Sequence, residues 1–327
     1  MISDTISIFS LDSGKEFAEK VAANLNLPIS KHEEREFEDG EHKIRSLESV
    51  RGKDVYIIQS LYSDVAMSVN DKLCRLLFFV GALKESGSKK VTLLIPYLCY
   101  ARKDRKTKPR DPVTTKYLAQ MIESVGTDHV VTLDVHNLQA FQNSFRCYSD
   151  HLEAKVLFAD YFSELKEDDI VIMSPDAGGM KRADEFRLTL GRKTNKELPL
   201  IFMEKKRSAG EVSGTSLVGE VKNKTVIIVD DLISSGTTLA RAAVACKEAG
   251  ARRVAAAATH GVFSSKAKEN LLNPALDKVI ITNSIPYLKI NQELVESKIK
   301  ILDIAPLIAE CIKRLHTNNS IVELTEK

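Results

Sequence analysis

Two adjacent aspartates stand at the end of an apolar run, directly before a short turn rich in hydroxyl groups. The aspartates are Asp230 and Asp231, and the turn consists of Ser234, Ser235, Gly236, Thr237 and Thr238. Backbone N–H groups in such a turn, at the start of a helix, can bind a phosphate because the helix dipole favours negative charge there. The neighbouring carboxylates can accept hydrogen bonds from hydroxyls or bind Mg²⁺. The segment therefore suits a phosphorylated sugar, and an ordinary strand, turn and capped helix is the alternative.

Polar residues also follow two other apolar runs. His136 comes after VVTLDV, and Asp176 follows VIMS and precedes two glycines. Taken alone, the histidine is typical of a structural or exposed position, and the aspartate is typical of a turn or a helix cap. Two ligands at strand ends in two halves of the chain could also hold one Mg²⁺ between them.

Three further segments concentrate charge. The range 32–41 (HEEREFEDGE) holds six acidic residues around one phenylalanine, and 102–110 (RKDRKTKPR) holds six basic residues in nine positions. The range 204–221 begins with an acid and three consecutive bases and then becomes rich in glycine and serine. From composition alone each is a solvated or flexible loop.

The basic run lacks the interleaved aromatics of a protein that binds single-stranded nucleic acid, and after an apolar strand it can neutralise a triphosphate. The third segment, also after a strand, could form a lid over charged ligands.

The elements that must position these residues alternate along the chain. Short β-branched runs (ISIF, VYIIQ, VTLLIP, VVTL, IVIMS, LIFM, VIIVDD, VAAAAT and VIIT) are separated by segments with helical patterns. Such alternation predicts an α/β fold with a parallel sheet and helices on both faces. Ligands of such sheets bind at the carboxyl ends of the strands, so the polar residues that follow strands are the candidates for chemistry.

The two halves of the chain resemble each other. Ser10-x-Asp12-x-Gly14 recurs as Ser174-x-Asp176-x-Gly178, and the segment from Lys84 to Val91 recurs from Lys247 to Val254. The separations of the two pairs differ by a single residue, which indicates a duplicated α/β domain. We expect the joint near 148–151, before a helix that begins around Leu152.

Composition excludes several classes of protein. The 327 residues are 43% hydrophobic and 28% charged, and no apolar run approaches the ~18–20 residues that span a membrane. The first ten residues lack the features of a secretory or transit signal, so we expect a cytoplasmic protein. A net charge of +2 does not indicate nucleic acid or a membrane surface as a partner. The five cysteines are far apart, which favours reduced thiols.

The chain as a whole resembles the ribose-phosphate pyrophosphokinase family. The run from Val229 to Thr238 alone also resembles the phosphoribosyl pyrophosphate (PRPP) loop of phosphoribosyltransferases. The other segments that match the family in order and spacing are Glu36–Glu41, Tyr97–Lys106, Leu133–His136, Ser174–Gly179 and Thr282–Pro286. Together they extend over nearly the full length. Simple phosphoribosyltransferases usually have a single domain without the duplicated half.

The resemblance implies a fold, a reaction and an assembly. The fold is two duplicated phosphoribosyltransferase-like (Rossmann-like) domains, 1–149 and 150–304, each a mostly parallel sheet flanked by helices, with 305–327 packed on the first. The reaction is Mg²⁺-dependent transfer of the β,γ-pyrophosphoryl group of ATP to the 1-hydroxyl of ribose 5-phosphate, which gives PRPP and AMP for nucleotide biosynthesis. The assembly is a homo-oligomer built from dimers, such as a hexamer, in which the acidic loop reaches the ATP site of a neighbouring subunit.

The resemblance also assigns roles to residues. The residues implied to bind ATP are Phe37, Asp39, Glu41, Arg102, Lys103, Asp104 and His136. The implied ligands of the Mg²⁺ on ATP are His136 and Asp176, and because imidazole is an unusual magnesium ligand, water or phosphate must complete the octahedron. The residues implied to bind ribose 5-phosphate are Asp230, Asp231, Ser234, Ser235, Gly236, Thr237 and Thr238. Lys205 and Arg207 are implied to be catalytic through their charge, without transferring protons.

Two other functions use parts of the same pattern. A phosphoribosyltransferase that consumes PRPP would have the same Asp-Asp turn without needing ATP, and a non-catalytic regulator would bind synthetase subunits. The chain also departs from the family pattern. It has Ser234–Thr238 where many relatives have Asp-Thr-x-Gly-Thr, Lys103 where many have glutamine, and a different tail at 320–324. In relatives the tail helps to form a site for ADP inhibition and phosphate activation, so the changed tail leaves open whether phosphate activates or ADP inhibits this protein.

Overall fold

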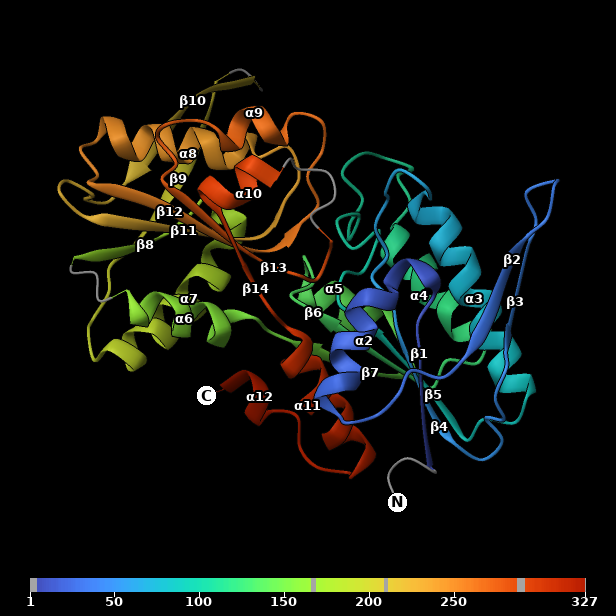
Figure 1. Ribbon diagram of the computed structural model, residues 1–327. Coiled ribbons are helices and arrows are strands. Elements are labelled where there is room, and N and C mark those ends of the chain that lie inside the picture. Colours follow the sequence, from blue (N-terminus) through green and yellow to red (C-terminus); the bar gives the residue numbers. More distant parts are fainter. Residues whose placement is uncertain (1–4, 166–168, 209–210, 287–291, 327) are drawn as a thin grey trace. The chain divides into compact units, whose positions relative to one another are not determined.

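The computed structural model of the protein describes residues 5–165, 169–208, 211–286 and 292–326, with side chains for all of these except 205–208, 211–215, 292, 295 and 326. The chain forms two compact units. Unit 1 is Met1–Glu153 with Ile304–Leu324, and unit 2 is Ala154–Asp303 with Thr325–Lys327. Both units are α/β with a mostly parallel sheet, which confirms the predicted fold class (Figure 1). Within the described ranges, no helix is both long enough and apolar enough to cross a membrane.

Unit 1 contains a five-stranded parallel sheet in the order β1-β4-β5-β6-β7. Its strands are β1 (Ile6–Phe9), β4 (Asp54–Ile58), β5 (Lys90–Ile95), β6 (His129–Leu133) and β7 (Tyr148–Leu152). The helices are α2 (Lys15–Asn24), α3 (Val69–Glu85), α4 (Thr114–Ser124), α5 (Leu138–Ser144) and α11 (Ala305–His316). Strands β1 and β6 are buried at every position, as their largely apolar sequences predict for a sheet covered on both faces.

Helix α3 and the sheet share the core of unit 1. The helix begins at a capping box, in which Ser68 and Asp71 each bind the other's backbone N–H. Its fully buried Phe79 packs edge to face on Phe9 of β1, with ring centroids 5.3 Å apart. A separate antiparallel hairpin, β2 (His32–Glu36) and β3 (His42–Ser46), lies along the same helix (Figure 1). The hairpin is therefore anchored on α3 and not on the sheet.

Unit 2 contains a seven-stranded sheet in the order β10-β9-β8-β11-β12-β13-β14, in which only the β9–β10 pairing is antiparallel. Its strands are β8 (Ile170–Ser174), β9 (Leu200–Ser208), β10 (Glu211–Val218), β11 (Thr225–Ile233), β12 (Arg253–Gly261), β13 (Lys278–Thr282) and β14 (Ile299–Leu302). The helices are α6 (Lys155–Glu164), α7 (Met180–Thr194), α8 (Thr237–Glu248), α9 (Ala267–Leu271) and α10 (Gln292–Lys298). Helix α7 contacts β8, β9 and β11, and α8 contacts β11 and β12.

The order of elements repeats between the two units. From the start of unit 1, and after α6 in unit 2, the chain forms a strand, a short 3₁₀ helix (η1, Asp12–Gly14, or η2, Ala177–Gly179), a longer helix and a hairpin, and then four strands alternating with helices. The repeated Ser-x-Asp-x-Gly motif lies at the same place in both, after the first strand. This correspondence supports the duplication inferred from the sequence.

Four features differ from the sequence-based expectations. The range 32–41, expected to be a loop, forms β2 and a short turn. The range 148–151, expected at the joint, belongs to edge strand β7. Helix α6 begins at Lys155 instead of around Leu152. In the range 204–221, expected to be a flexible loop or lid, residues 204–208 and 211–218 belong to the β9–β10 hairpin. The missed strands are polar, and strand propensity depends on the neighbours that a strand finds after folding.

Candidate active site

The strand order of unit 2 reverses between β8 and β11. From β8 the chain passes through α7 to β9 on one side, and it returns to place β11 on the other side, parallel to β8. At such a point the connections diverge and leave a crevice at the carboxyl ends of the two strands. Asp176 follows β8 directly, while Asp230 and Asp231 lie near the end of β11. The topology therefore brings the three predicted carboxylates to one edge of one sheet.

The Asp230–Asp231 pair places two carboxylates close together near the end of β11, beside one arginine of α7. The side chain of Asp231 is buried, and Nη1 of Arg182, from α7, lies 3.3 Å from Asp231 Oδ1 and 3.8 Å from Asp230 Oδ1. Burial and the charge of Asp231 raise the pKa of Asp230, and Arg182 only partly opposes this. A bound cation or a ligand's hydroxyl groups would stabilise the ionised pair.

Arg182 is a site residue that sequence reasoning missed. It stands in the first turn of α7, in a Met-Lys-Arg segment that gives no indication of which base faces the aspartates. Arg182 and Asp231 are 49 residues apart in the sequence, so nothing local indicates their contact. The one indication in the sequence is that Arg182 lies six residues after Asp176.

The turn after β11 has the geometry expected of a phosphate site. Gly236 adopts φ +73°, the left-handed region that glycine enters without strain, and N-caps α8 without a side-chain hydrogen bond. The first N–H groups of a helix have no partner within the helix and can bind an anion. Here the Thr237 N–H also donates a long hydrogen bond to Ser235 Oγ at 3.4 Å. Asn270 braces the turn, donating from Nδ2 to the Ser235 carbonyl at 2.7 Å and to Thr237 Oγ1 at 3.2 Å. The structure thus holds the predicted segment 234–238 as an ordered loop.

Asp176 has a structural role of its own. Its Oδ1 accepts hydrogen bonds from the N–H groups of Gly178 at 2.9 Å and Gly179 at 3.1 Å, which caps η2. This is the helix-cap role considered in the sequence analysis. The cap fixes the direction of the carboxylate relative to the strand end.

In unit 1, the loops after β5 and β6 meet at the carboxyl ends of these adjacent parallel strands. Asn137 connects them, donating from Nδ2 to Asp104 Oδ2 at 2.6 Å while its Oδ1 accepts from the Ala140 N–H at 3.1 Å. His136, next to Asn137, is exposed, and Asp134 adopts φ +40°, an uncommon conformation for a residue other than glycine. The structure therefore brings Asp104 and the His136 turn together, and Asn137 is a second residue that sequence reasoning missed.

Replacing Asn137 by alanine should weaken both the fold and the loop. Loss of the N-cap of α5 should lower the free energy of unfolding by about 1 kcal/mol. Because the family resemblance assigns Asp104 to ATP binding, loss of its contact with Asn137 should raise KM for ATP about threefold to tenfold. Denaturant unfolding and steady-state kinetics measure the two effects.

The matched control is Asn137→Asp, which keeps a capping oxygen but places a second carboxylate against Asp104. It should lose less stability than Asn137→Ala while still raising KM. An unchanged KM in both variants would contradict the positioning role.

Lys103 is held within its own loop. Its Nζ lies 2.5 Å from Asp111 Oδ2 and 3.0 Å from Thr107 Oγ1. Asp111 also accepts hydrogen bonds from Thr107 and from the Lys108 N–H, and these contacts hold the pKa of its carboxyl well below the usual range. The neighbouring Arg102 is exposed.

Lys103→Gln should therefore change KM for ATP by less than about threefold, because an ion pair at the protein surface contributes little even when half-buried, and Asp111 keeps its other donors. Arg102→Ala should raise the same KM by about tenfold or more. Steady-state kinetics compares the two variants. Equal losses would show that Lys103 contributes to ATP binding as much as Arg102 does.

The turn between β2 and β3 exposes the three residues implied to bind adenine. Phe37 closes the turn through its N–H to the Glu41 carbonyl at 2.8 Å, and Gly40 adopts φ +85°. Asp39 Oδ1 accepts the Glu41 N–H at 3.1 Å. The Phe37 ring is 41% exposed, and the Arg35 guanidinium lies 5.2 Å from its centroid. An exposed aromatic ring beside carboxylates suits stacking on a base.

Lys205 and Arg207 occupy alternate positions of β9. Their backbones pair with Thr215 and Val212 of β10, and the register shifts between Val212 and Gly214. Their side chains lie outside the described residues. The hairpin they occupy corresponds, in the order of elements, to the β2–β3 hairpin of unit 1.

Comparison with known proteins identifies the family. Residues 6–126 match the N-terminal domain of ribose phosphate pyrophosphokinase, and residues 168–326 match the phosphoribosyl synthetase-associated domain. The chain is 39% identical to a ribose-phosphate pyrophosphokinase of Campylobacter jejuni, over 97% of this chain and 98% of that one. The chain belongs to the ribose-phosphate pyrophosphokinase family. A second enzyme of this name, from Enterococcus faecalis, is 38% identical over 98% of this chain and 96% of its own.

The fold of this ribose-phosphate pyrophosphokinase family member matches a solved structure. The crystal structure of phosphoribosylpyrophosphate synthetase from Mycobacterium smegmatis superposes with a TM-score of 0.87 at 34% identity, covering 96% of this chain and all of that one. The protein is accordingly an enzyme that acts on small-molecule substrates, of a class that requires metal ions. Matches to full-length pyrophosphokinases argue against a stand-alone phosphoribosyltransferase and against a non-catalytic regulator.

Proposed function

We propose that the protein transfers the β,γ-pyrophosphoryl group of ATP to the 1-hydroxyl of ribose 5-phosphate and releases PRPP and AMP. The observation that carries this proposal is the Asp230–Asp231 pair beside the 234–238 turn, at the point where the strand order of unit 2 reverses. A phosphate on the turn places the ribose of the same molecule against the carboxylates, which can accept hydrogen bonds from its hydroxyls.

The ATP site is proposed for unit 1. Phe37 stacks on adenine while Asp39 and Glu41 accept hydrogen bonds from it, and the guanidinium of Arg102 binds phosphate oxygens. Asp104 and His136 are held near each other through Asn137. The exposed hairpin turn is also proposed to reach a neighbouring subunit, which makes the working enzyme a homo-oligomer built from dimers.

The residues of this chain suit Mg²⁺. Asp176, Asp230 and Asp231 gather at one sheet edge, and carboxylate oxygens are the ligands that this hard cation takes. We propose that His136 and Asp176 hold the Mg²⁺ of ATP, and that the Asp230–Asp231 pair binds ribose hydroxyls or a second Mg²⁺. When bound, Mg²⁺ supplies positive charge that neutralises the phosphate oxygens.

The chemical step requires alignment and charge. The 1-hydroxyl oxygen attacks the β-phosphorus, a new oxygen–phosphorus bond forms, and the bond to the oxygen bridging the α- and β-phosphates breaks, so AMP leaves. Little covalent help from the protein is needed, because such transfers depend on positioning and on stabilisation of charge. We assign the stabilising charge to Lys205 and Arg207. The proposed place of this reaction is the cytoplasm, where it supplies nucleotide biosynthesis.

A direct assay tests the reaction. The full-length protein is mixed with ATP, Mg²⁺ and ribose 5-phosphate, and AMP and PRPP are measured over time. We expect equal amounts of the two products and none without ribose 5-phosphate. Formation of AMP without PRPP, or consumption of added PRPP in the presence of a nucleobase and the absence of ATP, would contradict the proposal.

A further inference from the structure

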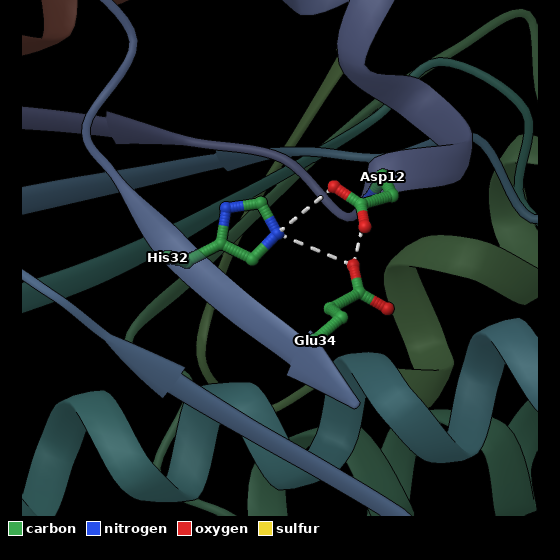
Figure 2. A group of neighbouring side chains, drawn as sticks. All are labelled: Asp12, His32 and Glu34. Atoms are coloured by element: carbon green, nitrogen blue, oxygen red, sulfur yellow. Dashed lines mark hydrogen bonds and ion pairs between the residues drawn. The ribbon is translucent and has the colours of Figure 1, made fainter. Parts of the chain in front are cut away.

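We propose that Asp12, His32 and Glu34 form a binding site for a divalent transition-metal cation at the base of the β2–β3 hairpin. Figure 2 shows the three side chains converging from η1 and from β2. One ligand atom of each lies within 4.8 Å of the other two. None of the three residues belongs to the proposed ATP or ribose 5-phosphate sites, so this site is independent of the proposed function.

The spacing of the ligand atoms fits one small cation. His32 Nε2 lies 3.3 Å from Glu34 Oε1 and 3.6 Å from Asp12 Oδ1. Bonds of about 2.0–2.2 Å at tetrahedral angles place ligand atoms about 3.3–3.6 Å apart. A cation can therefore enter among these atoms with little rearrangement of the chain.

The surroundings leave one side of the cluster open to solvent. The side chains of His32 and Glu34 are 9% and 5% exposed, whereas that of Asp12 is 66% exposed. Two ligands are thus desolvated and the third faces water, which provides an entry path and room for a water ligand.

Neighbouring groups orient the two buried ligands. His42 Nε2 lies 3.2 Å from Glu34 Oε2, the oxygen that does not face His32. The Asp12 backbone N–H donates to Glu34 Oε1 at 2.6 Å, and the His32 ring packs on Phe79 with centroids 5.6 Å apart. Outer contacts of this kind, to the second carboxylate oxygen and to the ring, accompany metal ligands because they fix their direction.

The charge of the cluster favours a cation. Asp12 and Glu34 together carry two negative charges when ionised. Among the described residues, Arg75 is the arginine or lysine whose side chain forms an ion pair with this cluster, with Nη1 3.6 Å from Glu34 Oε2. Arg75 also forms an ion pair with Glu36 at 2.6 Å. Metal binding through His32 requires the tautomer with its proton on Nδ1, which leaves the Nε2 lone pair for the cation. A divalent cation would balance the negative charge of Asp12 and Glu34 that Arg75 does not neutralise.

The donor set indicates which metal binds. One imidazole nitrogen and two carboxylate oxygens suit Zn²⁺ and Co²⁺ better than Mg²⁺ or Ca²⁺, which take oxygen ligands almost alone. Asp12 occupies in unit 1 the place in the order of elements that Asp176 occupies in unit 2. A cation there would tie β2, whose far end leads into the exposed turn, to the loop after β1.

The test is a Co²⁺ titration of the full-length protein, followed by visible absorption and by equilibrium dialysis. His32→Gln and Asp12→Asn each remove one ligand, and we expect each to bind one Co²⁺ fewer than the wild type at low concentration, with affinity at this site reduced about 100-fold. The matched control is His316→Gln, because His316 lies 3.1 Å from the Asp54 carboxylate but belongs to no cluster of three ligands within the described residues. It should titrate as the wild type does.

Two further variants complete the test. His136→Ala should keep the additional Co²⁺, which separates this site from the proposed ATP metal. If circular dichroism shows that His32→Gln does not fold, the Co²⁺ titration of Asp12→Asn tests the proposal, because the exposed Asp12 side chain can be replaced without disturbing the fold. The same stoichiometry and the same spectrum in the wild type and in folded Asp12→Asn would overturn the proposal and leave a cluster held by hydrogen bonds alone.

Discussion

Lys205→Ala is expected to lower kcat by about 10³-fold or more while ribose 5-phosphate binding stays nearly unchanged. A cation placed against a transferring phosphoryl group contributes most in the transition state, where charge develops, and losses of this size follow its removal from comparable sites. The backbone of Lys205 belongs to β9, whereas the phosphate turn follows β11 and is braced by Asn270. The ribose 5-phosphate site should therefore survive the substitution. Single-turnover kinetics measures the chemical step, and calorimetry measures ribose 5-phosphate binding.

The matched control for this prediction is Lys206→Ala. It removes the same charge from the next position of the same strand, which pairs with Gly214 instead of Thr215. We expect its kcat to stay within about threefold of the wild type. Wild-type turnover in Lys205→Ala would remove Lys205 from the mechanism, and equal losses in both variants would indicate that only the total charge of the hairpin matters.

Gly236→Val is expected to raise KM for ribose 5-phosphate by about 100-fold, or ~2.7 kcal/mol. Gly236 adopts φ +73°, which a β-branched residue adopts only with strain, and an added Cβ would lie 3.3 Å from Asn270 Cβ. The turn must then shift, and its N–H groups would no longer converge on one phosphate. Steady-state kinetics with varied ribose 5-phosphate gives the measurement.

Gly52→Val separates the general strain from the effect on the site. Gly52 has a similar φ of +71°, but an added Cβ would meet no atom within 4 Å. This variant should lose stability through backbone strain while KM for ribose 5-phosphate stays near that of the wild type. A similar rise of KM in both variants would mean that the turn does not bind the phosphate directly.

The sequence by itself determined the fold class and most of the central strands. Runs such as Ile170–Ser174 and Thr225–Val229 are short and rich in β-branched apolar residues, a pattern typical of strands buried on both faces of a parallel sheet. The turn around Gly236 was equally predictable, because glycine and the adjacent hydroxyl residues act on their own backbone. Features that depend on neighbouring residues in the chain can therefore be predicted from the sequence.

Tertiary structure decided the elements and contacts that depend on distant partners. Strands β2 and β7 are polar, and each is a strand because of what it pairs with or packs on, β3 and α3 in one case and β6 in the other. The contact of Arg182 with Asp231 joins helix α7 to strand β11, and that of Asn137 with Asp104 joins the loops after β6 and β5. Asp12, His32 and Glu34 meet only when η1 and β2 come together. These contacts follow from strand order, which is set by long-range burial and pairing and leaves no periodic signal in the sequence.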